Sequence, residues 1–328
     1  MSHANEPIRA AIIGTGYHVP DRIVTNADLT QLMDTSDEWI RERTGIKRRH
    51  IAAKEETTAS MGLEAARRAL EMADIAADEI DLIIVGTCTP DKVIPASACI
   101  IQRQLGIVGG GAMDVNAACS GFVYGLDLAN RFFRTGGARK ALVIGSETLS
   151  RITNWEDRTT AVLFGDGAGA VVLEASEEPG ILATHIHANG AYEDLLQTRN
   201  GVSLGFDASC EPGAAIEMNG NAVFKRAVST FDQMARETIA DLDGHLDDID
   251  WFIPHQANMR IITAAAKKLG MPMERVIATV DEHANTSGAS IPLALDLAVR
   301  DGRIQRGQTL LMAAFGAGFT WGSAMLRF

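Results

Sequence analysis

The chain has 328 residues, of which 46% are hydrophobic and 22% charged, and its formal net charge is −12. This length supplies material for a large core and allows one large domain or two medium ones. The acidic balance argues against a general nucleic-acid-binding role, because binding to phosphates requires a basic surface.

Cysteine usage and the N-terminal segment indicate the compartment. The four cysteines, Cys88, Cys99, Cys119 and Cys210, form no CxxC pair, so the spacing of a zinc site is missing. Residues 1–9 are polar and lack the apolar core of a signal peptide. No apolar run approaches the roughly 20 residues of a membrane helix. We expect a cytoplasmic protein with free thiols and no membrane segment.

The first half alternates strand-like and helix-like segments. Ala59, Leu63, Ala66, Leu70 and Ala73 recur at helical spacing, after a threonine cap at Thr57 or Thr58. Strands are predicted at 8–14, 82–86, 112–115, 141–145 and 169–173, and helices at 57–73, 97–105 and 121–135.

The second half repeats this rhythm. Strands are predicted at 181–188, 251–254 and 309–315, and helices at 221–242, 258–269 and 290–300, where Pro292 is tolerated in the first turn. Such alternation predicts an α/β architecture with buried sheets. No Pro- or Ser-rich linker divides the chain, so we expect two similar, closely packed halves, 1–175 and 176–328.

Cys119 lies between a predicted strand and a predicted helix. A sulfur at a helix N-terminus meets about half a positive charge from the macrodipole, which predicts a thiol pKa well below 8.5. The alternative is a buried, inert cysteine. That inert interpretation is favoured for Cys88, Cys99 and Cys210, which lack the same setting.

Two further polar residues occupy similar junctions. His255 ends a predicted strand, where side chains of α/β proteins commonly face the active cleft, although a hydrogen-bonded structural histidine is the alternative. Asn285 precedes a predicted helix and, alone, is typical of a turn or cap. Together with Cys119 they would supply a nucleophile, a proton-handling ring and an amide donor.

Glycine-rich segments require separate interpretation. In 165–170 the glycines precede the strand-like run Val171-Val172-Leu173 rather than a helix, which argues against a dinucleotide site. Gly14-Thr15-Gly16 follows a strand, but polar residues and Pro20 replace the expected helix. The segment 315–319 follows a strand and can present backbone N–H groups to a substrate oxygen, or it is only a tight turn.

Several long motifs occur in one order along the chain. They are 35–40 (TSDEWI) with 43–46 (RTGI), 116–122 (NAACSGF), 164–170 (FGDGAGA), 254–258 (PHQAN), 285–287 (NTS) and 315–321 (FGAGFTW). On these residues, from Ile8 to Phe328, the chain resembles the β-ketoacyl-acyl-carrier-protein synthase III family. These condensing enzymes of the thiolase-like superfamily start type II fatty acid synthesis.

The resemblance implies a five-layered αβαβα fold of two fused halves, a homodimer, and no metal or redox cofactor. It implies Cys119 as the acyl-carrying nucleophile, His255 and Asn285 as its partners, and the backbone N–H groups of Cys119, Gly316 and Ala317 as an oxyanion hole. The expected substrates are an acyl-coenzyme A, with acetyl-coenzyme A as the expected starter, and malonyl-acyl carrier protein.

The resemblance also implies binding residues. Coenzyme A is assigned to Trp39, Arg43, Arg158 and Asn258, the acyl carrier protein to Arg260, Lys267, Lys268 and Lys225, and the acyl pocket to Ile94, Leu163 and Phe224. For any one of the lysines, an ordinary solvated helix face is the alternative. Ala317 interrupts a run of glycines usual in the family, and Ile94 takes a position that a partner subunit contributes, which leaves the acyl length open.

Three alternatives remain at this stage. Papain-like hydrolases share the order Cys, His, Asn but place the cysteine near the mature N-terminus. A non-catalytic scaffold of the same fold is a second alternative. Related condensing enzymes of secondary metabolism, biotin precursor synthesis or head-to-head condensation use the same residues with other starters or acceptors.

Overall fold

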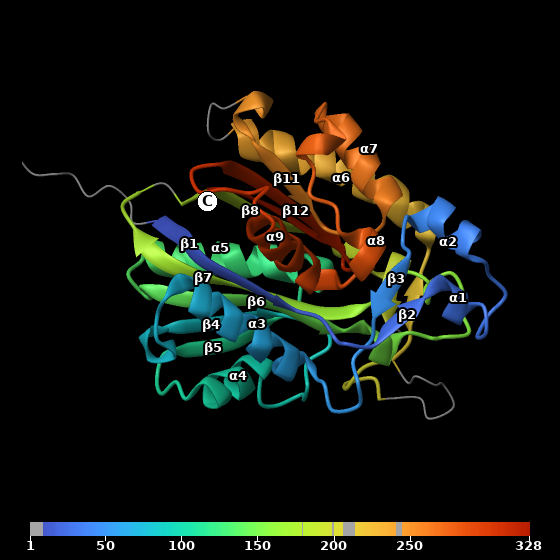
Figure 1. Cartoon of the computed structure of the whole chain (residues 1–328), viewed down its shortest axis with the longest axis horizontal. Helices are drawn as coiled ribbons and strands as arrows, with labels where there is room; N and C mark the ends of the chain where they lie inside the picture. Colours follow the sequence, from blue (N-terminus) through green and yellow to red (C-terminus); the bar gives the residue numbers. More distant parts are fainter. Residues whose placement is uncertain (1–8, 179, 199, 206–213, 241–244) are drawn as a thin grey trace, which may run out of the picture.

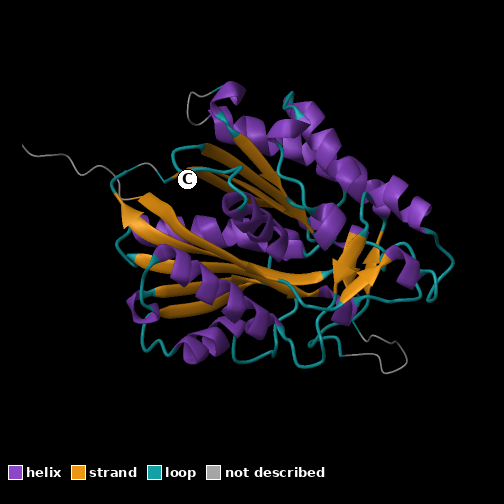
Figure 2. Ribbon diagram, in the orientation of Figure 1, coloured by secondary structure: helices purple, strands orange, loops and turns teal. Residues whose placement is uncertain are grey.

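Two β-sheets lie at the centre of the structure, with helices below, between and above them (Figure 1). The computed structural model describes residues 9–178, 180–198, 200–205, 214–240 and 245–328. Ile8 of the first predicted strand, Leu242 of a predicted helix and Cys210 lie outside the described residues. The layers alternate helix, sheet, helix, sheet, helix, which is the expected αβαβα arrangement (Figure 2).

The first sheet has the order β1(Arg9–His18), β7(Asp166–Ser176), β6(Lys140–Thr148), β4(Leu82–Gly86), β5(Gly111–Val115). β4 is parallel to β5 and β6, whereas β7 is antiparallel to β6 and β1. Ile83 and Val85 of β4 enter one core cluster, and Leu82 and Ile84 enter another. Burial on both faces explains why this strand is continuously apolar.

The second sheet has the order β11(Trp251–Pro254), β12(Thr309–Gly316), β13(Thr320–Arg327), β8(Ile181–Ala188). β11 and β12 are parallel, and β13 is antiparallel to β12 and β8. An isolated parallel bridge joins Phe252 to Val276 on the far side of β11. If Val276 is counted as a strand position, the strand order of the first sheet recurs in the second.

Six helices make the three helical layers. α3(Thr58–Ala73) and α4(Ser97–Leu105) cover the outer face of the first sheet, α5(Gly121–Arg134) and α9(Ser290–Arg300) lie between the sheets, and α6(Gly220–Ala240) and α7(Met259–Leu269) cover the second sheet (Figure 1). In α5 the residues Phe122, Leu126, Ala129 and Phe133 are all buried. This apolar stripe at helical spacing fixes α5 in the central layer.

Shorter elements surround the ends of the two sheets. They are β2(Ile23–Thr25), α1(Asn26–Leu29), α2(Asp37–Thr44), β3(Arg48–His50), β9(Leu196–Thr198), β10(Ile216–Met218) and α8(Val280–His283), with 3-10 turns at η1(Ala77–Glu79), η2(Ala118–Ser120), η3(Leu149–Ile152), η4(Gly190–Leu195), η5(Leu246–Asp248), η6(Met273–Arg275) and η7(Ser287–Ala289). No helix in the described part of the chain is long and apolar enough to cross a membrane.

Most predicted elements are confirmed, including the helix capped by Thr57, whose side chain accepts a hydrogen bond from the Ser60 N–H. The glycines of 165–169 lead into β7 and not into a helix, as predicted. β13 was not predicted. β1 continues to His18 instead of turning after Gly14, because Gly14 and Gly16 lie against α3. A Cβ atom there would lie 2.2 Å from the Ala69 carbonyl oxygen and 2.3 Å from that of Ala65.

Candidate active site

Cys119 lies in the turn η2 between β5 and α5, so the N-terminus of α5 is directed at it. Ala118 before it has φ of 46°, an uncommon value for a residue with a side chain. Gly316 approaches so closely that a Cβ there would lie 2.7 Å from the Cys119 backbone nitrogen. The Thr320 hydroxyl donates to the Ala117 carbonyl at 2.7 Å, which ties the C-terminal turn to the loop of Cys119.

His255 follows the end of β11 and is 2% exposed. Its backbone N–H donates to the Ala313 carbonyl of β12 at 2.8 Å, and its Nδ1 lies 2.7 Å from Oγ of Ser290. Burial lowers the pKa of His255 to about 3. The imidazole is therefore neutral near pH 7, and Ser290 occupies Nδ1 while Nε2 is left for a ligand.

Asn285 pairs through its backbone with the segment that ends the first half. Its N–H donates to the Leu163 carbonyl at 2.9 Å, and its carbonyl accepts from the Gly165 N–H at 3.0 Å. Ala284 and Ser287 on either side have φ of 58° and 50°. Positive φ values at residues with side chains mark a backbone held in place by its surroundings.

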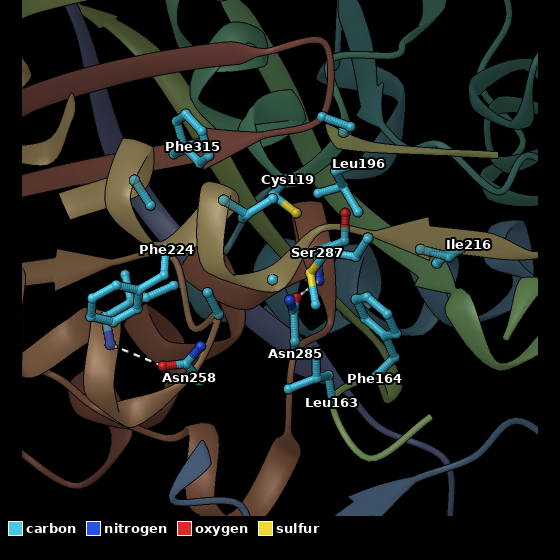
Figure 3. Close-up of a pocket in the computed structure, with 18 of the residues that line it drawn as sticks. Cys119, Leu163, Phe164, Leu196, Ile216, Phe224, Asn258, Asn285, Ser287 and Phe315 are labelled. Atoms are coloured by element: carbon cyan, nitrogen blue, oxygen red, sulfur yellow. Dashed lines mark hydrogen bonds between the residues drawn. The ribbon is translucent and has the colours of Figure 1, made fainter. Parts of the chain in front are cut away.

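One cavity of about 1020 Å³ brings the three candidates together. Cys119, His255 and Asn285 all line it, and Figure 3 shows Cys119 close to Asn285 and Ser287, which come from one segment before α9. Cys119 comes from the first half of the chain, whereas His255 and Asn285 come from the second. The spatial grouping that the sequence predicted is therefore present.

The predicted acidity of Cys119 is wrong for this structure. Burial raises the pKa of the Cys119 thiol to about 12. A hydrogen bond from Ser287 lowers the pKa, but by less than burial raises it, and the carboxylate of Glu147 raises it further. Loss of water around the sulfur is the largest cause, so the lowered pKa expected from the position before α5 is not found. The pKa of the Cys88 thiol is also raised well above its usual value, chiefly by burial. This raised pKa agrees with the prediction that Cys88 is inert.

Glu147 is a buried acid close to Cys119, and no sequence motif indicated it. It is fully buried at the end of β6, and burial raises its pKa above the usual value. Its carboxylate accepts from the Thr89 hydroxyl at 2.6 Å, the Thr87 hydroxyl at 3.1 Å, the Cys88 N–H at 3.1 Å and the Ser287 hydroxyl at 3.0 Å. A glutamate two residues after the apolar run 141–145 was the available signal, but most of its partners are remote in sequence.

Three of the residues assigned to coenzyme A line the cavity, and the fourth, Arg158, contacts one of these three. The guanidinium carbons of Arg43 and Arg158 lie 4.4 and 5.2 Å from the Trp39 ring centroid. Trp39 and Arg43 line the cavity. Arg158 does not line it but contacts the Trp39 ring. Asn258 also lines the cavity, but its Oδ1 accepts the Ile261 N–H at 2.9 Å and caps α7.

The other assigned residues divide into two groups. Leu163, Phe224, Ala317 and Arg260 line the cavity, and the Arg260 guanidinium lies 5.4 Å from the Phe224 ring. The remainder do not line it. Lys225 of α6 and Lys267 and Lys268 of α7 are exposed, and Ile94 is 83% exposed. The expected contribution of Ile94 to a partner's pocket stays a prediction.

Comparison with known proteins places the chain in a family. Models described as 3-oxoacyl-[acyl-carrier-protein (ACP)] synthase III match residues 113–190, and the C-terminal model of the same name matches 239–328. The chain is 60% identical over 319 residues to β-ketoacyl-[acyl-carrier-protein] synthase III of Thioalkalivibrio sulfidiphilus, covering 97% of this chain and 99% of that one. The chain belongs to the 3-oxoacyl-[acyl-carrier-protein] synthase III family.

Solved structures agree with membership of the synthase III family. The enzyme of that name from Aquifex aeolicus superposes with a TM-score of 0.92 at 46% identity, over 97% of this chain and all of the other. The priming β-ketosynthase of the R1128 polyketide pathway also superposes at 0.92, with 36% identity over 99% of each chain. The cysteine-hydrolase alternative finds no support, whereas the fold is shared by condensing enzymes of more than one pathway.

Proposed function

We propose that this chain is a β-ketoacyl-acyl-carrier-protein synthase III. It joins an acyl-coenzyme A starter, with acetyl-coenzyme A the expected one, to malonyl-acyl carrier protein by decarboxylative Claisen condensation, and so initiates fatty acid biosynthesis. The observation that carries the proposal is the meeting of Cys119, His255 and Asn285 in one cavity that Trp39 and Arg43 also line.

In the first half-reaction the Cys119 sulfur attacks the thioester carbonyl of acyl-coenzyme A. The backbone N–H groups of Cys119, Gly316 and Ala317 are the proposed oxyanion hole, supported by the close approach of Gly316 to the Cys119 nitrogen. The coenzyme A thiolate leaves and takes the proton that the cysteine gives up. Because burial holds Cys119 in the thiol form, the proton has to move as the carbon–sulfur bond forms.

In the second half-reaction malonyl-acyl carrier protein enters the same cavity. His255 and Asn285 donate hydrogen bonds to its thioester oxygen and stabilise the enolate that forms as carbon dioxide leaves. The neutral state of His255 supports this role. The Ser290 oxygen accepts from the Gln256 N–H, which favours donation of the Ser290 hydroxyl hydrogen to Nδ1 of His255, and the single hydrogen of the neutral imidazole then lies on Nε2. The carbanion attacks acyl-Cys119, the cysteine sulfur leaves, and β-ketoacyl-carrier protein is the product. Neither step requires a metal or a redox cofactor.

The carrier-protein partner is supported by charge. Arg260, Lys267, Lys268 and Lys225 place exposed cations on α6 and α7, in a chain whose net charge is −12. Such a local basic surface suits an acidic carrier protein. Arg260 lies at the cavity, so a carrier docked there can send its pantetheine arm inward.

The assembly, compartment and division of the chain are further parts of the proposal. A homodimer is supported by β5, which ends the first sheet, and by Val93 and Ile94, which are 69% and 83% exposed. A compartment that contains coenzyme A thioesters and keeps thiols reduced, the cytoplasm, suits the cysteine chemistry. The recurring strand order supports two similar halves, 1–175 and 176–328. The boundary lies near the end of β7 at Ser176, before β8 begins at Ile181.

A priming enzyme of a specialised pathway is the second candidate function. The likeness to the R1128 priming β-ketosynthase favours it, because that protein shares the fold over almost the whole chain. Intact-protein mass spectrometry after exposure to a panel of acyl-coenzyme A thioesters tests both. Acetylation of Cys119 followed by turnover with malonyl-acyl carrier protein supports the fatty acid initiator. Exclusive use of a longer or branched starter favours the specialised enzyme, and no acylation with any thioester contradicts both.

A further inference from the structure

A second group of reactive side chains lies on the outer side of the second sheet. His185 and His187 of β8 and Glu237 of α6 each present a ligand atom, and these atoms all lie within 4.8 Å of one another. Nε2 of His187 is 2.9 Å from one carboxylate oxygen of Glu237, and Nδ1 of His185 is 3.6 Å from the other. None of the three lines the active-site cavity.

The strand and the helix explain why these residues meet. Residues two apart on a strand project from the same face, so His185 and His187 both face α6, which covers that side of the sheet. Their rings are nearly parallel, at 3°, with centroids 6.3 Å apart. His187 also stacks on Trp321 of β13 at 5.6 Å, and the Tyr124 hydroxyl donates to its backbone carbonyl at 2.7 Å. The group is therefore built on regular, packed elements.

We propose that His185, His187 and Glu237 bind a divalent transition-metal ion of the Zn²⁺ class. Two imidazole nitrogens and one carboxylate oxygen are a ligand set that suits such ions, whereas Mg²⁺ and Ca²⁺ prefer oxygen alone. Ligand atoms about 2.0–2.2 Å from a tetrahedral zinc lie about 3.3 Å apart. The His187 nitrogen lies 2.9 Å from one Glu237 oxygen and the His185 nitrogen 3.6 Å from the other, and the three ligand atoms all lie within 4.8 Å of one another, so small side-chain rotations bring them to this spacing.

Solvent can complete the coordination. The side chains of His187 and Glu237 are each 34% exposed, and that of His185 is 18% exposed. Water can therefore occupy a fourth position. The cysteine spacing predicted no zinc site, and the proposed chemistry needs no metal. This site contains no cysteine and takes no part in the condensation.

The bound ion joins β8 to α6, two elements that come from separate stretches of chain. A ligand that binds only the folded state stabilises it, so Zn²⁺ raises the unfolding temperature of the protein. β13, which carries Trp321, pairs with β8 and is preceded by the turn that faces Cys119. The site thus strengthens the side of the second sheet that supports the active-site turn.

Equilibrium dialysis of chelator-treated protein against Zn²⁺ alone tests the proposal, after the accessible thiols have been alkylated to prevent binding by cysteine. The expected result is one saturable site per chain. His187→Ala and Glu237→Gln should each weaken binding at least about tenfold, because each removes a ligand. His18→Gln is the matched control, since His18 also lies beside a glutamate, at 3.4 Å, but outside the group. No saturable binding, or equal binding by all variants, overturns the proposal.

Two measurements on the unaltered cluster cover the case in which a ligand variant misfolds. Ni²⁺ should quench the fluorescence of Trp321, and Trp321→Phe should remove the saturable part of the quenching. Zn²⁺ should also protect His185 and His187, but not His18, from diethyl pyrocarbonate, as mapped by mass spectrometry in the wild-type protein. Equal modification of all three histidines at saturating Zn²⁺ contradicts the proposal.

Discussion

The backbone N–H of Ser287 donates a 2.8 Å hydrogen bond to Oδ1 of Asn285. An N–H donor can meet only the oxygen of the amide, so the Asn285 nitrogen is directed elsewhere and is left as a donor for the cavity. Asn285 is therefore oriented as a donor before any substrate binds, which reduces the reorganisation needed during the reaction.

Removal of that donor should separate the two half-reactions. Asn285→Ala and His255→Ala should each lower condensation with malonyl-acyl carrier protein by about two orders of magnitude or more. Both variants should retain some acylation of Cys119, since the proposed oxyanion hole for that step is backbone. Intact mass measures acylation, and carbon dioxide release measures condensation. Cys119→Ser is the control that loses both; condensation at the wild-type rate in either alanine variant disproves the assigned role.

The raised pKa of Cys119 predicts how its alkylation depends on pH. Because only the thiolate reacts and the pKa is about 12, the rate of labelling by iodoacetamide should rise about tenfold for each pH unit between pH 7 and 9.5. The site of labelling is located by peptide mass spectrometry, with Cys119→Ser as the control. A plateau within this range would mean that the charge at the α5 N-terminus prevails over burial after all.

The cation and ring contacts of Trp39 predict an effect that depends on the nucleotide of coenzyme A. Trp39→Ala should raise the KM for acetyl-coenzyme A several-fold, because Arg43 and Arg158 lose the ring that they flank. Acetyl-N-acetylcysteamine, which lacks the nucleotide, is the matched control substrate. An equal rise in KM for both thioesters would place the effect of Trp39 elsewhere than at the nucleotide.

Glu147 should be important for stability as well as for the site. Glu147→Gln replaces one acceptor oxygen by an NH2 group that faces hydroxyl and N–H donors, which should lower the free energy of unfolding by about 1–3 kcal/mol. Thr89→Val removes a single donor and keeps the carboxylate, so it should cost less. Urea unfolding measures both variants. A Gln variant as stable as wild type shows that the carboxylate is not required as an acceptor.

Two buried histidines should make the protein sensitive to acid. Burial lowers the pKa of His255 to about 3 and, with the charge of His50, that of His283 to about 4, against an ordinary value of 6.5. Between the lowered pKa of each histidine and 6.5, that histidine is protonated in the unfolded chain but neutral in the folded chain. The free energy of unfolding therefore falls as the pH falls below 6.5. Each histidine should cost about 2 kcal/mol between pH 7 and 5. Urea unfolding at pH 7 and pH 5 measures this loss of stability, and the loss should be smaller for His255→Gln than for the wild-type protein. An equal loss in both proteins contradicts the burial of a neutral His255.

Local patterns in the sequence predicted much of this protein. Helical spacing and a threonine cap located α3, and a continuous apolar run located β4. Strand-to-helix junctions marked Cys119 and His255, and a turn before a predicted helix marked Asn285. These signals are carried by neighbouring residues, and the forces that they reflect act over one or two turns or along one strand. The ordered motifs along the whole chain then indicated the family.

The tertiary structure decided the electrostatics and the long-range partners. The turn before α5 predicted an acidic thiol, but only the folded chain shows that burial raises the pKa of Cys119 instead. The donors around Glu147, the exposure of Ile94 and the meeting of His187 with Glu237 likewise depend on segments far apart in sequence. Burial and contact are properties of the whole packed chain, whereas the periodicity of a segment is its own.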